Sequence, residues 1–195
     1  GTVTNDNTPT FRWNAVTDPS GVTYILLVDN DSGFSSPEIN ISGLTENAYT
    51  PITALADENY SWRVRAVDNA GNPSNWSSVW TLTVDVTPPG VSLPAYSPDP
   101  DNDNTPSYSG TATDATTDVV DIEYRVDGGS WTDVDSFTRS LSVGFTFTTP
   151  ELADGAHTID VRAMDNAGNW SALASDTLTV DVTPPGVSLP AYSPD

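Results

Sequence analysis

An internal repeat constrains this chain more than any other feature. The segment TLTVDVTPPGVSLPAYSPD occurs at 81–99 and again, without a change, at 177–195, which is an offset of 96 residues. The shorter segment DNAGN recurs at 68–72 and 165–169, an offset of 97 residues. Because self-similarity at a fixed spacing is typical of tandem modules, we expect the 195 residues to fold as two related modules rather than as one domain.

Apolar and polar residues alternate along several short segments of both modules. Tyr60, Trp62 and Val64 alternate with polar neighbours, and the same pattern runs through 122–126 and 159–163. A period of two residues is typical of a half-buried strand. No stretch keeps a helical period over three turns, and 16 Pro and 13 Gly supply frequent turns. The pattern therefore predicts β-sandwiches.

The motifs of the two modules resemble known families. Module 1, with PTFRW, LADENYSWRVRAVDNAGNPSNWS and TLTVD, resembles a fibronectin type III domain. Module 2, with SGTATD, IEYRVDGGSW and LADGAHTIDVRAMDNAGNWS, is similar to a bacterial immunoglobulin-like domain. The resemblance implies an all-β chain of two tandem immunoglobulin-like (fibronectin type III-like) β-sandwiches in an extended arrangement. It also implies a tyrosine corner at Tyr60, and we expect His157, at the matching place in module 2, to weaken that corner.

The repeat divides the chain into three segments. We predict that residues 1–86 form a fibronectin type III-like sandwich lacking its own first strand, because only residues 1–4 precede NDNTP. Residues 87–182 form a bacterial immunoglobulin-like sandwich that has this strand in PPGVSLPAYSP, at 88–98. Residues 183–195 are a linker and an orphan first strand of the next module. Three explanations of the absent strand at the start and the orphan strand at the end stay open. The sequence is one period of a longer tandem array, copies of the chain exchange strands, or the boundary of the sequence is arbitrary.

The charge of the chain excludes several classes of partner. Six basic residues face 27 acidic ones, which gives a formal net charge of −21. Nucleic acids and anionic membrane surfaces both attract clustered Lys and Arg, so neither is an expected partner. No apolar run approaches the roughly 18–20 residues of a membrane span, so we expect no membrane insertion in this segment. Of the acids, 22 are Asp and 5 are Glu, and Asp favours turns and calcium sites.

The strand order of such a sandwich gathers carboxylates at the module ends. Asp85 leaves module 1 and should approach Asp114 and Asp165 at the top of module 2. In 99–104, carboxylates recur at every second residue, so one turn could aim several oxygens at a single Ca²⁺ ion. The alternative is that these side chains bond to the local backbone and only shape turns. The predicted ligands for Ca²⁺ as a cofactor are Asp85, Asp99, Asp101, Asp103, Asn104, Asp114, Asp165 and Asp181.

Catalysis is not expected, so we predict that the chain is not an enzyme. Its one His, His157, lies on the inward face of a strand, and the sequence has neither a glycine-rich phosphate loop nor a nucleophile elbow. Chance alone yields several glycosylation sequons in a chain this rich in Asn, Ser and Thr. The candidate sequons begin at Asn30, Asn40, Asn59, Asn75 and Asn169.

The segment WSSVW at 76–80 is similar to the box of cytokine-receptor fibronectin domains in which Trp and Arg side chains interleave. Arg12, Arg63 and Arg65, on outward strand positions, are the expected cations. Such a ladder stiffens one face of a sheet. A sugar-binding surface is the alternative, and it requires two or three coplanar exposed rings.

These observations predict a structural repeat segment of an extracellular or cell-surface fibre, stalk or filament. We expect calcium to stiffen its interdomain junctions, with head-to-tail strand complementation as one route to its assembly. The expected partners are neighbouring copies of the same chain or adjacent repeats, with surface glycans as a further class. The alternative function is an adhesin or a carbohydrate-binding accessory module of a secreted protein.

Overall fold

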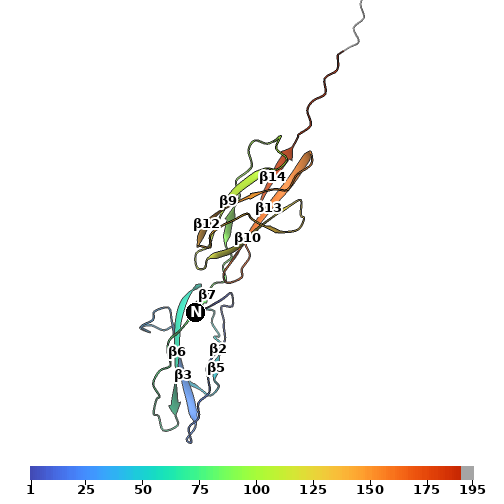
Figure 1. Ribbon diagram of the computed structural model, residues 1–195. Coiled ribbons are helices and arrows are strands. Elements are labelled where there is room, and N and C mark those ends of the chain that lie inside the picture. The colour runs from blue at the N-terminus through green and yellow to red at the C-terminus, as the bar shows by residue number, and fades with distance from the viewer. Residues whose placement is uncertain (190–195) are drawn as a thin grey trace, which may run out of the picture.

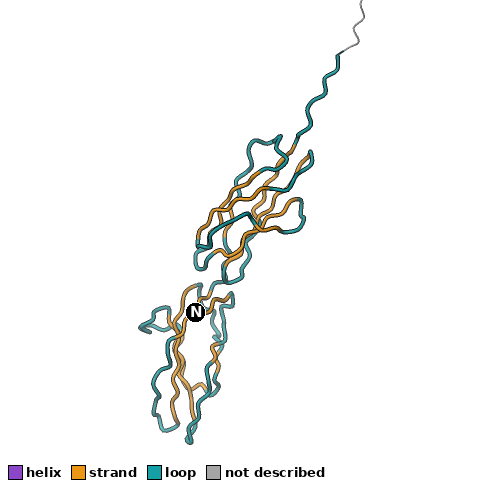
Figure 2. The backbone as a smooth tube through the Cα atoms, in the orientation of Figure 1, coloured by secondary structure: helices purple, strands orange, loops and turns teal. Residues whose placement is uncertain are grey.

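The computed structural model describes residues 1–189. That part of the chain contains strands, turns and loops, and none of its segments is a helix long and apolar enough to cross a membrane. Two β-sandwiches lie end to end, and the last described residues lead away from the second sandwich (Figures 1 and 2). A short linker at 85–89 joins β7 of the first to β8 of the second. The predicted fold class, two tandem sandwiches in an extended arrangement, is confirmed.

The first domain contains a five-stranded sheet in the order β1-β7-β6-β3-β4 and a two-stranded sheet of β2 and β5. The longest strand, β6, carries the alternating pattern that the sequence shows, with Tyr60, Trp62 and Val64 buried. Its strands are β1 (Thr2–Thr4), β2 (Phe11–Arg12), β3 (Val22–Asp29), β4 (Ile39–Leu44), β5 (Ala48–Tyr49), β6 (Glu58–Asp68) and β7 (Trp80–Val84).

The second domain contains a four-stranded sheet in the order β11-β10-β13-β14 and a three-stranded sheet in the order β12-β9-β8. All neighbouring strands in both sheets run antiparallel. Its strands are β8 (Gly90–Ser92), β9 (Ser107–Thr113), β10 (Val119–Val126), β11 (Thr132–Asp133), β12 (Ser142–Thr148), β13 (Gly155–Asp165) and β14 (Ala174–Val180).

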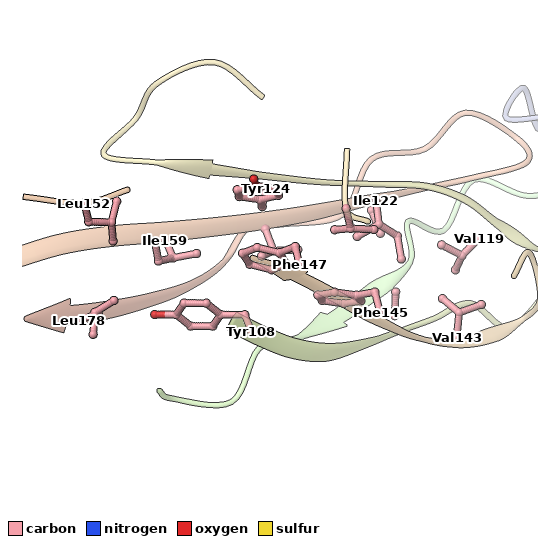
Figure 3. Packing of buried hydrophobic residues seen from close by; sticks show 14 of the residues in the cluster. Tyr108, Val119, Ile122, Tyr124, Val143, Phe145, Phe147, Leu152, Ile159 and Leu178 are labelled. Carbon is pink, nitrogen blue, oxygen red and sulfur yellow. The ribbon is translucent and has the colours of Figure 1, made fainter. Parts of the chain in front are cut away.

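Aromatic rings fill the centre of the second domain. Phe147 is fully buried and stacks on Tyr124 at 4.1 Å and on Tyr108 at 5.4 Å between ring centroids (Figure 3). This cluster holds 15 buried residues, whereas the main cluster of the first domain holds 8. Because each fully buried large apolar side chain contributes about 1.5–3 kcal/mol, we expect the second domain to be the more stable.

The first domain begins with a strand that the sequence prediction left out. β1 pairs in parallel with β7 and places Thr4 opposite Val84. The second domain repeats this contact with Asp101 opposite Val180. What the described part of the first domain lacks is a counterpart of β8. The prediction that 1–86 has no first strand of its own is therefore corrected, since only the half equivalent to β8 is missing.

The predicted orphan strand at 183–195 lies mostly beyond what the structure describes. Residues 183–189 form no regular element and are exposed. The part at 190–195 lies outside the described residues.

Both domains retain the corner expected at Tyr60. The Tyr60 hydroxyl donates to the carbonyl of Ala56 at 3.1 Å. In the second domain Nε2 of His157 bonds to the carbonyl of Ala153 at 2.9 Å, while Nδ1 contacts a carboxylate oxygen of Asp127 at 2.7 Å. These partners raise the pKa of His157, the Ala153 carbonyl most. The expected weakening of the second corner is not found, because His157 bonds to the carbonyl of Ala153, which is the counterpart of the Ala56 carbonyl that Tyr60 contacts in the first domain.

Tryptophan and arginine side chains interleave on the outer face of each domain. Arg63 and Arg65 lie over the ring of Trp76, at 4.6 and 4.5 Å from its centroid. In the second domain Arg162 lies between Trp131 and Trp170, at 4.1 and 4.0 Å. Cation–π contacts of this kind are worth about 0.5–1 kcal/mol each at exposed sites. The predicted ladder is therefore present at Trp76 with Arg63 and Arg65, whereas the third expected cation, Arg12, lies over no aromatic ring in the described part of the chain.

Candidate metal centre

Three strand ends bring carboxylates together where the two domains meet. Asp85 directly follows β7, and its N–H donates to the carbonyl of Thr4 at 3.0 Å. Asp114 directly follows β9, and Asp165 is the last residue of β13. One carboxylate oxygen from each of the three lies within 4.8 Å of the others. The approach expected from strand order is thus what the structure shows.

Burial makes this cluster electrostatically costly. Asp85 is 0% exposed and Asp165 is 1% exposed. Ion pairs elsewhere in residues 1–189 use other carboxylates, and no Arg or His pairs with the cluster. Burial raises the pKa of Asp85, a hydrogen bond from Thr117 opposes the rise, and the charges of Asp114 and Asp165 add to it. The site therefore favours either a proton or a cation.

Neighbouring polar groups fix the carboxylates in place and link the two domains. Thr117 Oγ1 donates to Oδ2 of Asp85 at 2.5 Å across the junction. Asn169 Nδ2 donates both to the carbonyl of Asp85 and to Oδ2 of Asp165, each at 2.8 Å. Asp114 accepts two backbone N–H bonds on Oδ1. Since an ionised carboxylate has about four acceptor positions, lone pairs remain for a hard cation.

The turn at 99–104 is built differently. Asp101 and Asp103 each accept a bond from the backbone N–H two residues ahead, at 3.2 and 2.8 Å. Asp99 accepts from a backbone N–H of β14 at 2.9 Å, and Asn104 donates to Glu151 at 2.9 Å. Within residues 1–189 the one group of three converging ligands is the junction cluster. The turn-shaping alternative thus describes Asp101 and Asp103, whereas Asp99 and Asn104 bond to distant segments of the second domain.

Asp181 occupies, at the far end of the second domain, the place that Asp85 has in the first. Its N–H donates to the carbonyl of Asp101 at 2.9 Å, as that of Asp85 does to Thr4. Asp181 is exposed, whereas Asp85 is buried by the neighbouring domain. Its predicted role as a ligand therefore depends on a further module at that end.

The sequons fall into two groups. Asn169 uses its amide nitrogen in both junction hydrogen bonds, so a glycan there would break the link between the domains. The other candidates are exposed, and their glycosylation stays a prediction; they are Asn30, Asn40, Asn59 and Asn75.

Sequence reasoning missed Thr117 and the structural use of Asn169, although the repeated final Asn of DNAGN was a signal for the second. It also missed a cleft of about 430 Å³ in the first domain. Trp13, Trp62 and Trp80 line this cleft, and 57% of the surface of Trp80 is exposed. The rings of Trp62 and Trp80 meet edge to face at 70°, so they are not the coplanar platform that sugar stacking needs.

Comparisons with known proteins find a curated relative of similar sequence. Chitinase A1 of Niallia circulans is 31% identical over 194 residues, which cover 93% of this chain and 25% of that protein. The chain thus spans about a quarter of the length of this curated relative.

Solved structures are similar at lower identity. The fibronectin(III)-like modules of Clostridium thermocellum CbhA are 19% identical with a TM-score of 0.45, over 92% of this chain and 89% of that one. A mutant SrpA adhesin from Streptococcus sanguinis is 22% identical with a TM-score of 0.34, over 50% of this chain and 60% of that one. The model of the bacterial Ig-like domain family matches residues 1–86 and 100–182. The chain belongs to the bacterial Ig-like domain family, with one member in each half.

Proposed function

We propose that this chain is a structural, non-catalytic pair of modules from an extracellular or cell-surface protein. In this proposal a Ca²⁺ ion bound between the modules holds them in line. The observation that carries it is the convergence of Asp85 from the first domain with Asp114 and Asp165 from the second.

The electrostatics of the junction support a cation. Two unit charges at 4.8 Å repel by about 3 kcal/mol at an effective dielectric constant of about 20. A divalent ion replaces these repulsions with attractions. Calcium is favoured over magnesium because it accepts irregular sets of oxygen ligands, while magnesium demands near-octahedral geometry.

A shared ion would also resist bending. Its ligands come from both domains, so tilting one domain against the other would stretch the metal–oxygen distances. The linker is already restricted, since Pro88 and Pro89 fix φ and supply no N–H donors. Folded sandwiches would then set the length of the rod, and junction ions would keep it straight.

Thermal unfolding with millimolar calcium and with a chelator tests this proposal. Calcium at about 100 times its dissociation constant stabilises the folded state by about 2.7 kcal/mol, which raises the melting temperature. Asp85→Asn should abolish the calcium-dependent rise. Asp181→Asn is the matched control for the isolated chain in dilute solution, because Asp181 lies in the same DVTPP sequence but is exposed with no module packed against it, and it should leave the rise intact. An unchanged melting temperature of the parent chain at millimolar calcium would exclude the proposed site.

A carbohydrate-binding accessory role is the second candidate, and the similarity to a chitinase favours it. The aromatic cleft of the first domain would be the binding surface, although its edge-to-face rings suit sugar stacking poorly. Binding on a glycan array that is lost in Trp80→Ala and kept in Trp170→Ala would support this role. A blank array would count against it.

A further inference from the structure

The outer face of the five-stranded sheet in the first domain carries two arginines without acidic partners. Arg63 and Arg65 lie on β6, opposite Leu27 and Ile25 of β3. Neither side chain takes part in an ion pair among residues 1–189, where the three ion pairs all lie in the second domain. In a chain with 27 acidic and 6 basic residues, two neighbouring cations without a carboxylate call for a physical reason.

The second domain shows the same face with its charges paired. The repeat offset of 97 residues places Arg162 and Asp160 of β13 at the two positions that arginines occupy in β6. Arg162 contacts Glu123 on β10 at 2.6 Å, and Asp160 contacts Arg125 at 2.9 Å. Each cation on this strand pair therefore has a carboxylate of its own.

Both carboxylates of that arrangement are missing from the first domain. Glu123 lies directly opposite Arg162 in the second domain, whereas the residue opposite Arg65 is Ile25. The second carboxylate is replaced by Arg63 itself. Two ion pairs have thus given way to two cations that pair with no carboxylate in the described part of the chain.

An aromatic ring orients both guanidinium groups. The centroid of Trp76 lies 4.6 Å from Cζ of Arg63 and 4.5 Å from Cζ of Arg65. The Nε atom of each arginine is buried and has no hydrogen-bond partner within residues 1–189. The terminal nitrogens are therefore the donors that a ligand can reach. Stacking fixes these groups in place but leaves their charge uncompensated.

A turn before β4 adds a second ring to Arg63. Phe34 lies 4.1 Å from Cζ of Arg63, and its φ of 58° is uncommon for a bulky side chain. The same turn contains a carboxylate, Asp31, which accepts bonds from the N–H of Gly33 and the hydroxyl of Ser35. The acidic group of this turn is thus used within the turn, and Arg63 keeps its free charge.

The arrangement favours a small ligand with one carboxylate. An arginine guanidinium binds a carboxylate through two parallel N–H···O bonds. A polyanion is disfavoured, because residues 1–86 contain 3 basic and 10 acidic residues and carry a formal charge of −7. An extended peptide fits poorly as well. It would need a free strand edge, and β6 is paired with β3 on one side and with β7 on the other.

Beyond Arg63 the same face carries uncharged polar side chains. Ser61 lies opposite Thr81 of β7, and Asn59 lies opposite Thr83. These four residues line one groove. Their hydroxyl and amide groups can both donate and accept hydrogen bonds, as the hydroxyl groups of a sugar require. The face therefore matches both kinds of group on a sugar acid.

We propose that the outer face of β6 binds a sugar that carries a carboxylate. Arg63 and Arg65 hold the carboxylate, and Ser61 and Thr81 bond to the hydroxyl groups of the sugar ring. The inference rests on the carbohydrate-binding candidate of the proposed function and names its class of sugar. It places that sugar on the outer face rather than in the aromatic cleft, and it does not need calcium.

Calorimetric titration of the 195-residue chain with a glucuronic acid-terminated oligosaccharide tests this inference. The methyl ester of the same oligosaccharide is the neutral control, and the parent chain should bind the acid but not the ester. Arg63→Gln and Arg65→Gln should each weaken binding by about tenfold, because each removes a charged hydrogen-bonded pair. Arg139→Gln makes the same change of charge at an exposed site of the second domain and should bind as the parent does.

Ile25→Glu tests the site while keeping both arginines. It places opposite Arg65 the carboxylate that Glu123 places opposite Arg162. The new ion pair should abolish binding of the acid, and the melting temperature should stay close to that of the parent, which excludes unfolding as the cause. Binding of the acid at the parent's affinity by Ile25→Glu would overturn the inference.

The remaining outcomes separate this site from the aromatic cleft. Trp80→Ala alters the cleft and should leave binding of the acid unchanged, whereas Arg63→Gln should leave any binding of neutral glycans in the cleft unchanged. Loss of acid binding in Trp80→Ala would contradict the placement on the outer face. Equal binding of the acid and its ester, no binding of the acid, or tighter binding of a sulfated oligosaccharide of the same length would each contradict a carboxylate site.

Discussion

The two domains share a fold but treat one edge in opposite ways. In the second, β8 lies so close that a Cβ atom on Gly110 would meet the backbone oxygen of Ser92 at 2.6 Å and the ring of Phe145 at 2.4 Å. In the first, Trp13 takes the position of Gly110 and lies opposite the small Asn47, with its N–H bonded to the Asn47 carbonyl at 3.1 Å. In the second domain the large residue of this cross-strand pair is Phe145, opposite Gly110, whereas in the first domain it is Trp13, opposite Asn47. The large side chain therefore comes from the other strand of the pair.

The open edge of the first domain is partly sealed from within. The hydroxyl of Tyr24 accepts the N–H of Val16 at 2.9 Å, close to where a β8-like strand would pair. The Tyr24 side chain thus satisfies a backbone donor at this edge.

The largest expected effect concerns the centres of the two cores. Phe147→Ala should destabilise the second domain by about 3–5 kcal/mol, because it removes a fully buried ring that stacks on two others. Tyr49, which occupies the equivalent position opposite Phe11, is only half-buried. Tyr49→Ala should therefore cost the first domain less. Chemical denaturation monitored for both domains measures the two costs, and equal losses would contradict the comparison of the cores.

The identical segments provide a sharper comparison. Leu93→Ala should destabilise the second domain by about 1–2 kcal/mol, since Leu93 is half-buried against the core. Leu189→Ala changes the same residue in the same sequence but at an 88% exposed site, and in dilute solution it should cost almost nothing. The check is thermal unfolding of both variants. Similar losses of stability in Leu93→Ala and Leu189→Ala in dilute solution would contradict the difference in burial between these two residues.

The smallest expected effect is a difference in the pH dependence of stability between the corner at His157 and the corner at Tyr60. The pKa of His157 is raised, so its contribution is fully present below the unfolded-state pKa of about 6.5 and is lost as the pH rises through the folded-state pKa. The loss should stay below about 1 kcal/mol. His157→Gln should remove this pH dependence from the second domain, and denaturation between pH 6 and pH 9 measures it. Tyr60→Phe in the first domain should show no such dependence, because the Tyr60 hydroxyl is neutral over that range.

Local patterns were sufficient for the fold class and for part of the site. The alternation of Tyr60, Trp62 and Val64 predicts β6. In the folded strand these side chains are buried and their neighbours are not, because one face of the sheet packs on the core. The junction cluster follows from strand order, because the order of the strands fixes at which end of a sandwich each connecting loop and the end of the domain must lie. Asp85, Asp114 and Asp165 could therefore be placed together without coordinates.

Local patterns left two interpretations open where a side chain suits two uses. The spacing of Asp101 and Asp103 suits both a calcium ligand set and a chain of turn bonds, and only the folded turn shows the second. His157 is a similar case, because its effect on the corner depends on Ala153 being within reach.

The sequence by itself determined the all-β class, the two modules and the acidic junction, because repeat, period and strand order are properties of the chain. Only the tertiary structure decided that the first domain keeps β1 and has an open cleft where β8 would lie. The physical reason is that a cleft is a relation between distant segments. Two segments of identical sequence, 88–93 and 184–189, are half-buried or exposed according to what lies beside them.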